Sequence, residues 1–192
     1  MSGLVDAYSF WTFTDIFEES YFPSQPFHGG FGLLNLHGIP KPTYRGYELL
    51  HNLGAEQLPV DGSHETVDAW VVRKEHSLTV LITNHALPRH PIGAGQVHIK
   101  LTGAPELRYA YVERIDDTHA SARALWHEMG EPEYLRASEV ERLQEASRVR
   151  KERHVWRYED RTIHLDINLP PHCVAAITVE LAPDRSEGGG RA

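Results

Sequence analysis

Short runs in which apolar and polar residues alternate fill much of the chain after residue 56, and they constrain its fold more than any other feature. Within one run, Val97, Ile99 and Leu101 are separated by His98 and Lys100. Successive side chains of a β-strand point to opposite faces of its sheet, so this alternation indicates a strand with one buried and one hydrated face. Six such runs are recognisable, at residues 67–72, 78–83, 97–101, 109–115, 163–167 and 174–181. Six or more strands separated by turns predict an antiparallel β-sandwich.

One helix is predicted to interrupt these strands. Ser138 is followed three residues later by Glu141, the pattern of a capping box, and Val140 and Leu143 begin an apolar stripe. Residues 183–192 are rich in glycine and charge and are expected to be disordered.

The beginning of the chain has a different composition, rich in aromatic residues and carboxylates. All six phenylalanines lie between residues 10 and 31, and three carboxylates, Asp15, Glu18 and Glu19, are interleaved with them. Flat apolar faces beside acceptors for hydroxyl groups are what a sugar-binding cleft needs. This segment is therefore the first candidate for a binding site.

The same segment predicts a strand, a long loop and a helix. Residues 4–13 are mostly β-formers, and residues 20–40 contain three prolines and four glycines, which indicates a loop. Pro42 suits the first position of a helix, for which Gly54 would be the C-cap. One strand and one helix cannot bury their own apolar faces, so this unit either packs on the sandwich or belongs to a larger α/β body.

Charge and composition exclude several classes of partner. The formal net charge of −8 argues against nucleic acid, whose phosphates need a basic protein face, and we interpret the basic run at residues 148–153 as a solvated helix end. No apolar stretch approaches the ~18 residues of a membrane span. No signal peptide opens the chain, which predicts a cytoplasmic location, although a leader encoded upstream of Met1 would leave no trace here. The single cysteine, Cys173, excludes a disulfide framework.

The 13 histidines raise the question of a metal site. Pairs such as His85 and His90, or His37 and His51, lack the spacing of the HExxH and Cys/His zinc motifs. We therefore expect no metal and no cofactor. No serine, histidine and aspartate set stands out as a catalytic triad.

Three motifs of the first segment resemble a known family in their order and spacing. They are WTFTDIFEE at residues 11–19, PFHGGFGLL at 26–34 and HGIPKPTYRGYELLHNLG at 37–54. Together they resemble the β-xylosidases of glycoside hydrolase family 39. The run YAYVERIDDTHASARALWHEMGEPEYL at residues 109–135 resembles the matching part of α-L-iduronidase, a relative of these xylosidases.

This resemblance implies a (β/α)8 barrel followed by a β-sandwich. The expected fold is mainly β: an antiparallel β-sandwich with one inserted helix, preceded by the last strand-loop-helix unit of a truncated (β/α)8 barrel. Residues 1–56 would be the barrel remnant, with its eighth strand, active-site loop and final helix, residues 57–182 the sandwich, and residues 183–192 the tail. The loop would then lie at the C-terminal face of the barrel, where such enzymes keep their active sites.

The resemblance also implies a retaining glycoside hydrolase that cleaves the O-glycosidic bonds of xylo-oligosaccharides. Such enzymes use two carboxylates about 5–5.5 Å apart, one as nucleophile and one as acid/base. In the family the acid/base follows an asparagine at the end of the fourth strand, and the nucleophile ends the seventh. This chain contains no Asn-Glu pair, and Glu133 in the motif PEYL lies far downstream, in the predicted sandwich. We therefore expect no catalytic residue in this chain and no hydrolysis by it alone.

Binding roles follow from the same resemblance. Trp11 resembles a tryptophan that walls the sugar subsite, the alternative being a core tryptophan beneath the loop. Glu19 resembles a carboxylate that accepts hydrogen bonds from xylose hydroxyls, the alternative being a solvated turn, and Glu18 is its neighbour.

The remaining candidate residues belong to the loop. Asp15 either caps the turn or orients Trp11 and His28. Phe27 and His28 lie on the glycine-flanked loop and are expected to line the outer subsite.

The partners expected from this reading are a xylose-type saccharide, a separately encoded barrel portion and, by analogy with the family, further copies of the chain. Two other functions stay open. The chain is either a non-catalytic carbohydrate-binding or interaction β-sandwich module, or a subunit of a split enzyme.

Overall fold

The computed structural model describes residues 7–16 and 25–182, and it confirms the six predicted strands. They are β2 (Val67–Lys74), β3 (Ser77–Asn84), β4 (Gly95–Thr102), β5 (Leu107–Ile115), β8 (Thr162–Leu169) and β9 (Cys173–Leu181). Three shorter strands were not predicted: β1 (Glu56–Leu58), β6 (Glu152–Arg153) and β7 (Trp156–Glu159). Runs of two to four residues are too short to display an alternation, so the sequence carries no usable signal for them.

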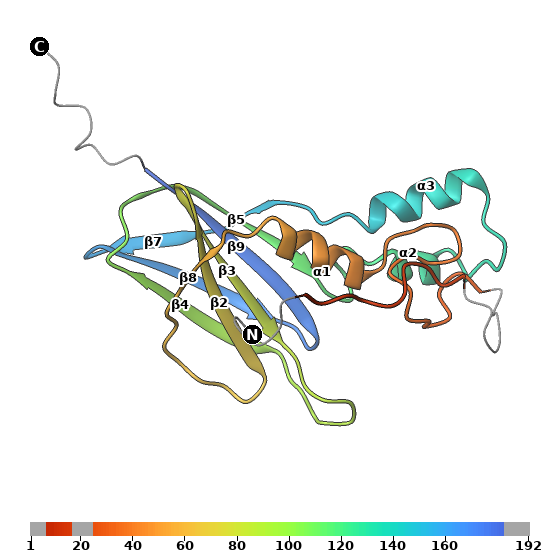
Figure 1. The fold of residues 1–192 in the computed structure, drawn as a ribbon, viewed down its shortest axis with the longest axis horizontal. Helices are drawn as coiled ribbons and strands as arrows, with labels where there is room; N and C mark the ends of the chain where they lie inside the picture. The colour runs from red at the N-terminus through yellow and green to blue at the C-terminus, as the bar shows by residue number, and fades with distance from the viewer. Residues whose placement is uncertain (1–6, 17–24, 183–192) are drawn as a thin grey trace, which may run out of the picture.

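These strands form two antiparallel sheets (Figure 1). The larger sheet has the order β1-β2-β3-β9-β5-β6, and the smaller has the order β4-β8-β7. Strand β9 lies in the middle of the larger sheet, where its Ile177 is opposite Val80 of β3 and Val112 of β5. A central strand covered on both faces explains why residues 173–179 read as an almost continuous apolar run.

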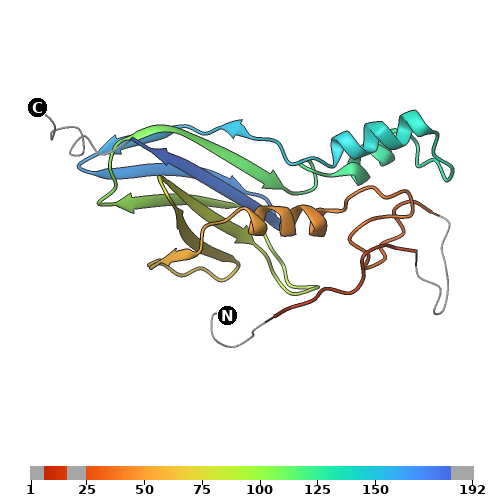
Figure 2. The same cartoon turned by 45° about the horizontal axis from the view of Figure 1, so that its top comes forward.

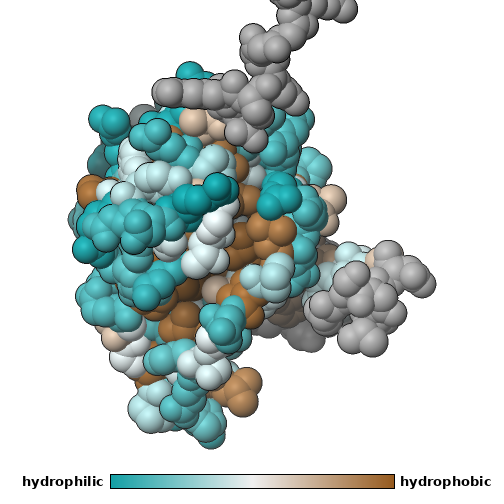
Figure 3. All heavy atoms as spheres, turned by 90° about the vertical axis from the view of Figure 1, so that its left-hand side faces the viewer, coloured by the Kyte–Doolittle hydropathy of each residue, from teal (hydrophilic) through white to brown (hydrophobic). Residues whose placement is uncertain are grey.

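The main core lies between the two sheets. From the smaller sheet, Ile163, Leu165 and Ile167 join a buried cluster with side chains of the larger sheet such as Val80 and Ile177. The alternation in residues 163–167 is thus confirmed as one buried face and one wetter face. Apolar residues gather in the middle of the surface at the end where β4, β7 and β8 lie, with hydrophilic residues around them (Figure 3).

Helix α1 (Pro42–His51) begins at the predicted proline and lies against the outer face of the larger sheet (Figure 2). Its Leu49 is buried with Leu81 and Ala176. The predicted C-cap is wrong, because the helix ends at His51 and its C-cap is Asn52, which keeps a right-handed conformation. Gly54 is needed for a different reason: a Cβ atom there would overlap the backbone carbonyl of Arg73.

Two helices, not one, interrupt the strands: α2 (Ala122–Glu128) and α3 (Ala137–Ala146). The predicted capping box is wrong by two residues. The backbone N–H of Arg136 donates to Oε2 of Glu139 at 2.7 Å. The N-cap is therefore Arg136, two residues before the predicted Ser138, and the helix begins at Ala137. Leu143 of the predicted stripe is fully buried.

The predicted strand at residues 4–13 is not found in its described part. Residues 7–13 carry no strand, and pairing is limited to an isolated parallel bridge between Thr14 and Leu34. A strand requires a neighbour that pairs along its length, and the part of the chain described here places none beside residues 7–13. The predicted tail at residues 183–192 lies outside the described residues, and none of the described helices is long and apolar enough to cross a membrane.

Candidate functional site

The described part of the loop, residues 15–16 and 25–41, is organised around one buried carboxylate. The Asp15 side chain is only 1% exposed, and its two oxygens accept hydrogen bonds from Nζ of Lys41 at 2.8 and 3.0 Å. Oδ1 also accepts the backbone N–H of Gly32 at 2.8 Å, while Lys41 donates to the carbonyl of Gly30. A buried ion pair offsets its desolvation only when further hydrogen bonds complete it, as these do. We call Asp15, His28, Gly30, Gly32 and Lys41 the Asp15 cluster.

The backbone around this cluster is close-packed. The N–H of Leu34 donates to the carbonyl of Phe13 at 2.9 Å, and the N–H of Asp15 donates to the carbonyl of Leu34 at 2.9 Å. A Cβ atom on Gly32 would overlap the backbone of Thr14 and Asp15, so only glycine allows this approach. The two ends of the loop are therefore held together by backbone and side-chain bonds at once.

His28 belongs to the same cluster, and one of its two ring nitrogens has no hydrogen-bond partner among the described residues. Its Nδ1 accepts the N–H of Gly30 at 3.2 Å, which assigns the ring proton to Nε2. Nε2 is buried, lies 3.8 Å from Oδ2 of Asp15, and has no hydrogen-bond partner among the described residues. The structure thus brings the two predicted residues Asp15 and His28 together.

Trp11 lies on the surface of the same loop region. Its side chain is 65% exposed, and its ring lies 6.3 Å from that of Phe31, which is 56% exposed. The peptide bond between Trp11 and Thr12 is cis. The alternative position for Trp11, in the core beneath the loop, is not the one observed.

Phe27 anchors the loop to the inserted helices. Its ring lies 5.4 Å from that of Trp126 in α2, and both belong to a cluster with buried Ile39 and Leu143. The indole N–H of Trp126 donates to the carbonyl of Pro132 at 3.0 Å. The sandwich insertion therefore supports the loop from one side.

The two remaining predicted residues, Glu18 and Glu19, lie outside the described residues. The residue that sequence reasoning missed is Lys41. A signal for it existed, because Lys41 is the only lysine or arginine in the first 41 residues, which also contain Asp15 and other carboxylates. Its pairing with Asp15, 26 residues away, was not visible without the fold.

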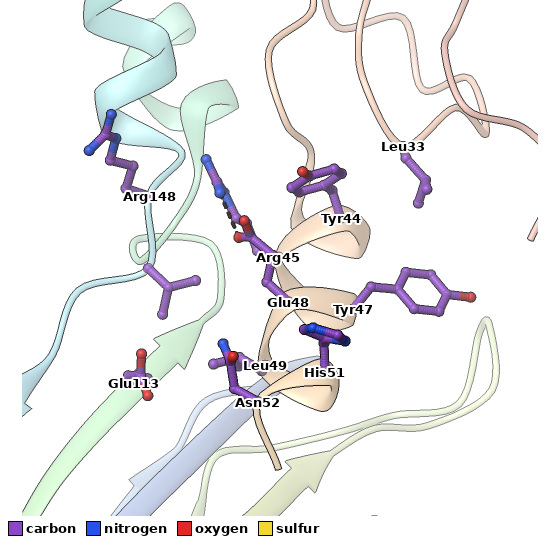
Figure 4. Close-up of a pocket in the computed structure, with 11 residues that line it drawn as sticks. Leu33, Tyr44, Arg45, Tyr47, Glu48, Leu49, His51, Asn52, Glu113 and Arg148 are labelled. Atoms are coloured by element: carbon purple, nitrogen blue, oxygen red, sulfur yellow. Dashed lines mark hydrogen bonds and ion pairs between the residues drawn. The ribbon is translucent and has the colours of Figure 1, made fainter.

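A separate hollow of about 800 Å³ lies between α1, β5 and the segment after α3 (Figure 4). Arg45 crosses it, donating from Nε to the carbonyl of Ser147 at 2.8 Å and pairing through Nη1 with Oε2 of Glu48 at 2.6 Å. Burial raises the pKa of the Glu113 carboxyl at its edge, although Lys151 acts in the opposite direction. None of Asp15, Trp11, Phe27 and His28, the predicted site residues that the structure describes, lines this hollow, so its size does not make it the better candidate.

No metal centre of the usual kind is found in the described residues. Nowhere in residues 7–16 and 25–182 do three or more His, Cys, Asp or Glu side chains group as ligands of one ion. The Asp15 cluster, with its partly buried lysine, holds the loop in shape, and the rings of Trp11 and Phe31 are exposed on the same loop region.

Comparison with known proteins links this loop and the sandwich to one family. Residues 1–162 match Glycosyl hydrolases family 39. One relative is a beta-xylosidase of Caldicellulosiruptor saccharolyticus, which is 42% identical over 90% of this chain and 36% of that protein. Another is a beta-xylosidase of Geobacillus stearothermophilus, which is 33% identical over 95% of this chain and 35% of that protein. The crystal structure of the GH39 enzyme from Xanthomonas axonopodis pv. citri is similar with a TM-score of 0.72 and 26% identity, over 94% of this chain and 38% of that one. The chain thus spans about a third of the length of the two xylosidases.

Proposed function

The chain belongs to glycosyl hydrolase family 39, and we propose that it supplies one wall of the sugar site of a β-xylosidase-type glycoside hydrolase but not the catalytic pair. The observation that carries this proposal is the exposed indole of Trp11, held on a loop that the buried Asp15–Lys41 pair closes. An indole face stacks on the C–H groups of a sugar at low entropic cost. The family resemblance drawn from the three sequence motifs is confirmed.

The proposal extends to the division of the chain. Residues 1–56 would be the last strand-loop-helix unit of a (β/α)8 barrel, and residues 57–182 the sandwich that follows it. Supporting this division, α1 starts at Pro42 directly after the loop, and the bridge between Thr14 and Leu34 is parallel. The remaining strands and helices of a barrel would be the partner in this arrangement.

The proposed roles of the side chains follow from their chemistry. Trp11 would stack on a xylose ring, with Phe31 beside it. Glu18 and Glu19 would accept hydrogen bonds from sugar hydroxyls, which charged acceptors make stronger. Asp15 would keep the loop in place, because both of its carboxylate oxygens accept hydrogen bonds from within the loop and its side chain is only 1% exposed.

The absence of the catalytic pair is supported by the lack of an Asn-Glu pair in the sequence and by the engagement of Asp15. Purified chain incubated with nitrophenyl β-xyloside is expected to release no nitrophenol above a blank. Clear turnover by the chain alone would refute this part of the proposal.

Sugar binding is tested by calorimetry with xylo-oligosaccharides. Trp11→Ala is expected to weaken binding about tenfold, the factor that ~1.4 kcal/mol represents. Trp70→Ala is the matched control, because Trp70 is an exposed tryptophan of β2 outside this loop, and it should bind as the unaltered chain does. Equal weakening by both substitutions would show that Trp11 has no specific role.

The second candidate function is a non-catalytic carbohydrate-binding module, which the exposed rings of Trp11 and Phe31 also favour. The two functions predict different effects of an added barrel portion on hydrolysis. Adding the corresponding part of a family 39 xylosidase should restore hydrolysis if the chain completes an enzyme. Binding without any such rescue supports the module.

A further inference from the structure

The outer face of the smaller sheet carries a chain of three hydrogen-bonded side chains that the sugar site does not use. Oδ1 of Asp166 lies 2.6 Å from Nδ1 of His98, and Nε2 of His98 lies 3.1 Å from Nδ1 of His164. His98 and Asp166 are direct partners across β4 and β8, and His164 is the diagonal neighbour of His98. The rings of the two histidines lie 5.3 Å apart and are inclined by only 26°.

The carboxylate determines the state of the first histidine. Asp166 accepts the proton of Nδ1, so in neutral His98 the lone pair is on Nε2. A histidine that donates its second N–H to a carboxylate is the arrangement that orients imidazoles around bound metal ions. His98 is therefore already in the form that a metal ligand requires.

The second histidine supplies a nitrogen at a suitable distance. Two nitrogens that each lie ~2.0–2.1 Å from a tetrahedral ion are separated by roughly 3.3 Å. Nε2 of His98 and Nδ1 of His164 are 3.1 Å apart, so a small outward shift of the rings would admit an ion between them. The proton on His164 would move to Nε2, and water would fill the remaining positions.

We propose that His98 and His164 form a two-histidine site for a divalent late transition metal, with Asp166 as the outer partner that orients His98. Imidazole ligands favour copper over nickel and zinc in the general order of metal affinities, and they do not suit magnesium or calcium. This inference does not depend on the proposed sugar site.

Two cations limit the affinity of this site. Lys100 is paired opposite His164 across β4 and β8, and Nη2 of Arg157 lies 3.4 Å from Oδ2 of Asp166. Both repel a dication, and the described residues add no third ligand.

The test is a titration of the full chain with copper(II) chloride and, separately, zinc chloride, followed by calorimetry and by the melting temperature. One equivalent of copper should bind to this site and raise the melting temperature. His98→Gln and His164→Gln should each remove that event, and Asp166→Asn should weaken it about 10- to 100-fold. Electron paramagnetic resonance of the copper complex should report two nitrogen ligands.

The matched control is the pair His85 and His172, whose rings lie 5.6 Å apart in a T-shaped arrangement. The double variant His85→Gln/His172→Gln should bind copper as the unaltered chain does. His98, His164 and Asp166 point away from the core, so their variants should retain the fold by circular dichroism. If copper binding is absent, or unchanged by His98→Gln and His164→Gln, the proposal is overturned.

Discussion

Lys41 has more consequences for the candidate site than any other single side chain. It neutralises Asp15, a carboxylate that is 1% exposed, and it also binds the carbonyl of Gly30. Its removal would leave a charge buried without a partner, which is the costly way to break an ion pair. The shape of the loop therefore depends on one cation.

Lys41→Ala is predicted to destabilise the loop by about 3–5 kcal/mol. Hydrogen exchange should accelerate at the amides of residues 25–41, where the N–H of Gly32 is bound to Asp15, while β3 and β9 keep their protection. Lys100→Ala, which removes an exposed lysine of β4, is the control and should leave exchange in the loop unchanged. Unaltered exchange in Lys41→Ala would contradict the structural role of the pair.

A second residue-scale prediction concerns pH. Burial, helped by the charge of Arg114, lowers the pKa of His154, although Asp166 acts in the opposite direction. The unfolded chain therefore binds this proton more readily than the folded protein. The stability that His154 contributes is fully present above its unfolded pKa of about 6.5 and is lost as the pH falls toward the lower folded pKa.

Replacing His154 with Gln should accordingly flatten the curve of unfolding free energy against pH below about 6.5. Urea denaturation at several pH values measures this. The exposed His90→Gln variant should keep the slope of the unaltered protein. A slope in His154→Gln as steep as before would assign the pH dependence to other groups.

Among the elements, α1 shows how much of a local structure can be predicted. Its start at Pro42 followed from the preference of proline for the first turn. Its end did not follow, because Gly54 is selected by contact with Arg73 in β2 and not by the helix itself. Local sequence rules therefore predicted the start of α1 but not its end.

Two glycines near this helix make a matched test. Gly46 lies inside α1 with open space around its Cα, so Gly46→Ala should stabilise the protein by about 0.5–1 kcal/mol. Gly54→Ala should destabilise it, since the new methyl group would overlap backbone atoms of Arg73 that cannot move aside. Thermal unfolding of both variants should show shifts of opposite sign, and a shift of the same sign would refute the stated role of Gly54.

The inserted helices were the element least accessible to prediction. Helix α2 is seven residues long, which is too short for its periodicity to be recognised. Its Trp126 packs on Phe27, a contact that the sequence does not indicate. The start of α3 was misplaced because Glu139, and not Glu141, caps the backbone. The second error concerns a helix end, where several polar residues could serve as caps.

At the scale of the whole molecule, stability comes from the apolar layer between the two sheets. Leu165 of β8 is fully buried there, together with residues of the larger sheet. Leu165→Ala should lower the unfolding free energy by about 2–5 kcal/mol, the range for removing a leucine from a close-packed core. Leu87→Ala, at a leucine that is 68% exposed, should change it by less than about 0.5 kcal/mol. Urea denaturation that shows equal effects would contradict this account of the core.

The sequence by itself determined the six main strands and the family, because alternation and motif spacing are properties of neighbouring residues. Only the tertiary structure decided that β9 lies at the centre of its sheet, that Lys41 binds Asp15, and that His98, His164 and Asp166 meet on one face. The physical reason is distance along the chain. These contacts join residues that are 26 to 103 positions apart, and nothing in a local pattern says where the chain returns.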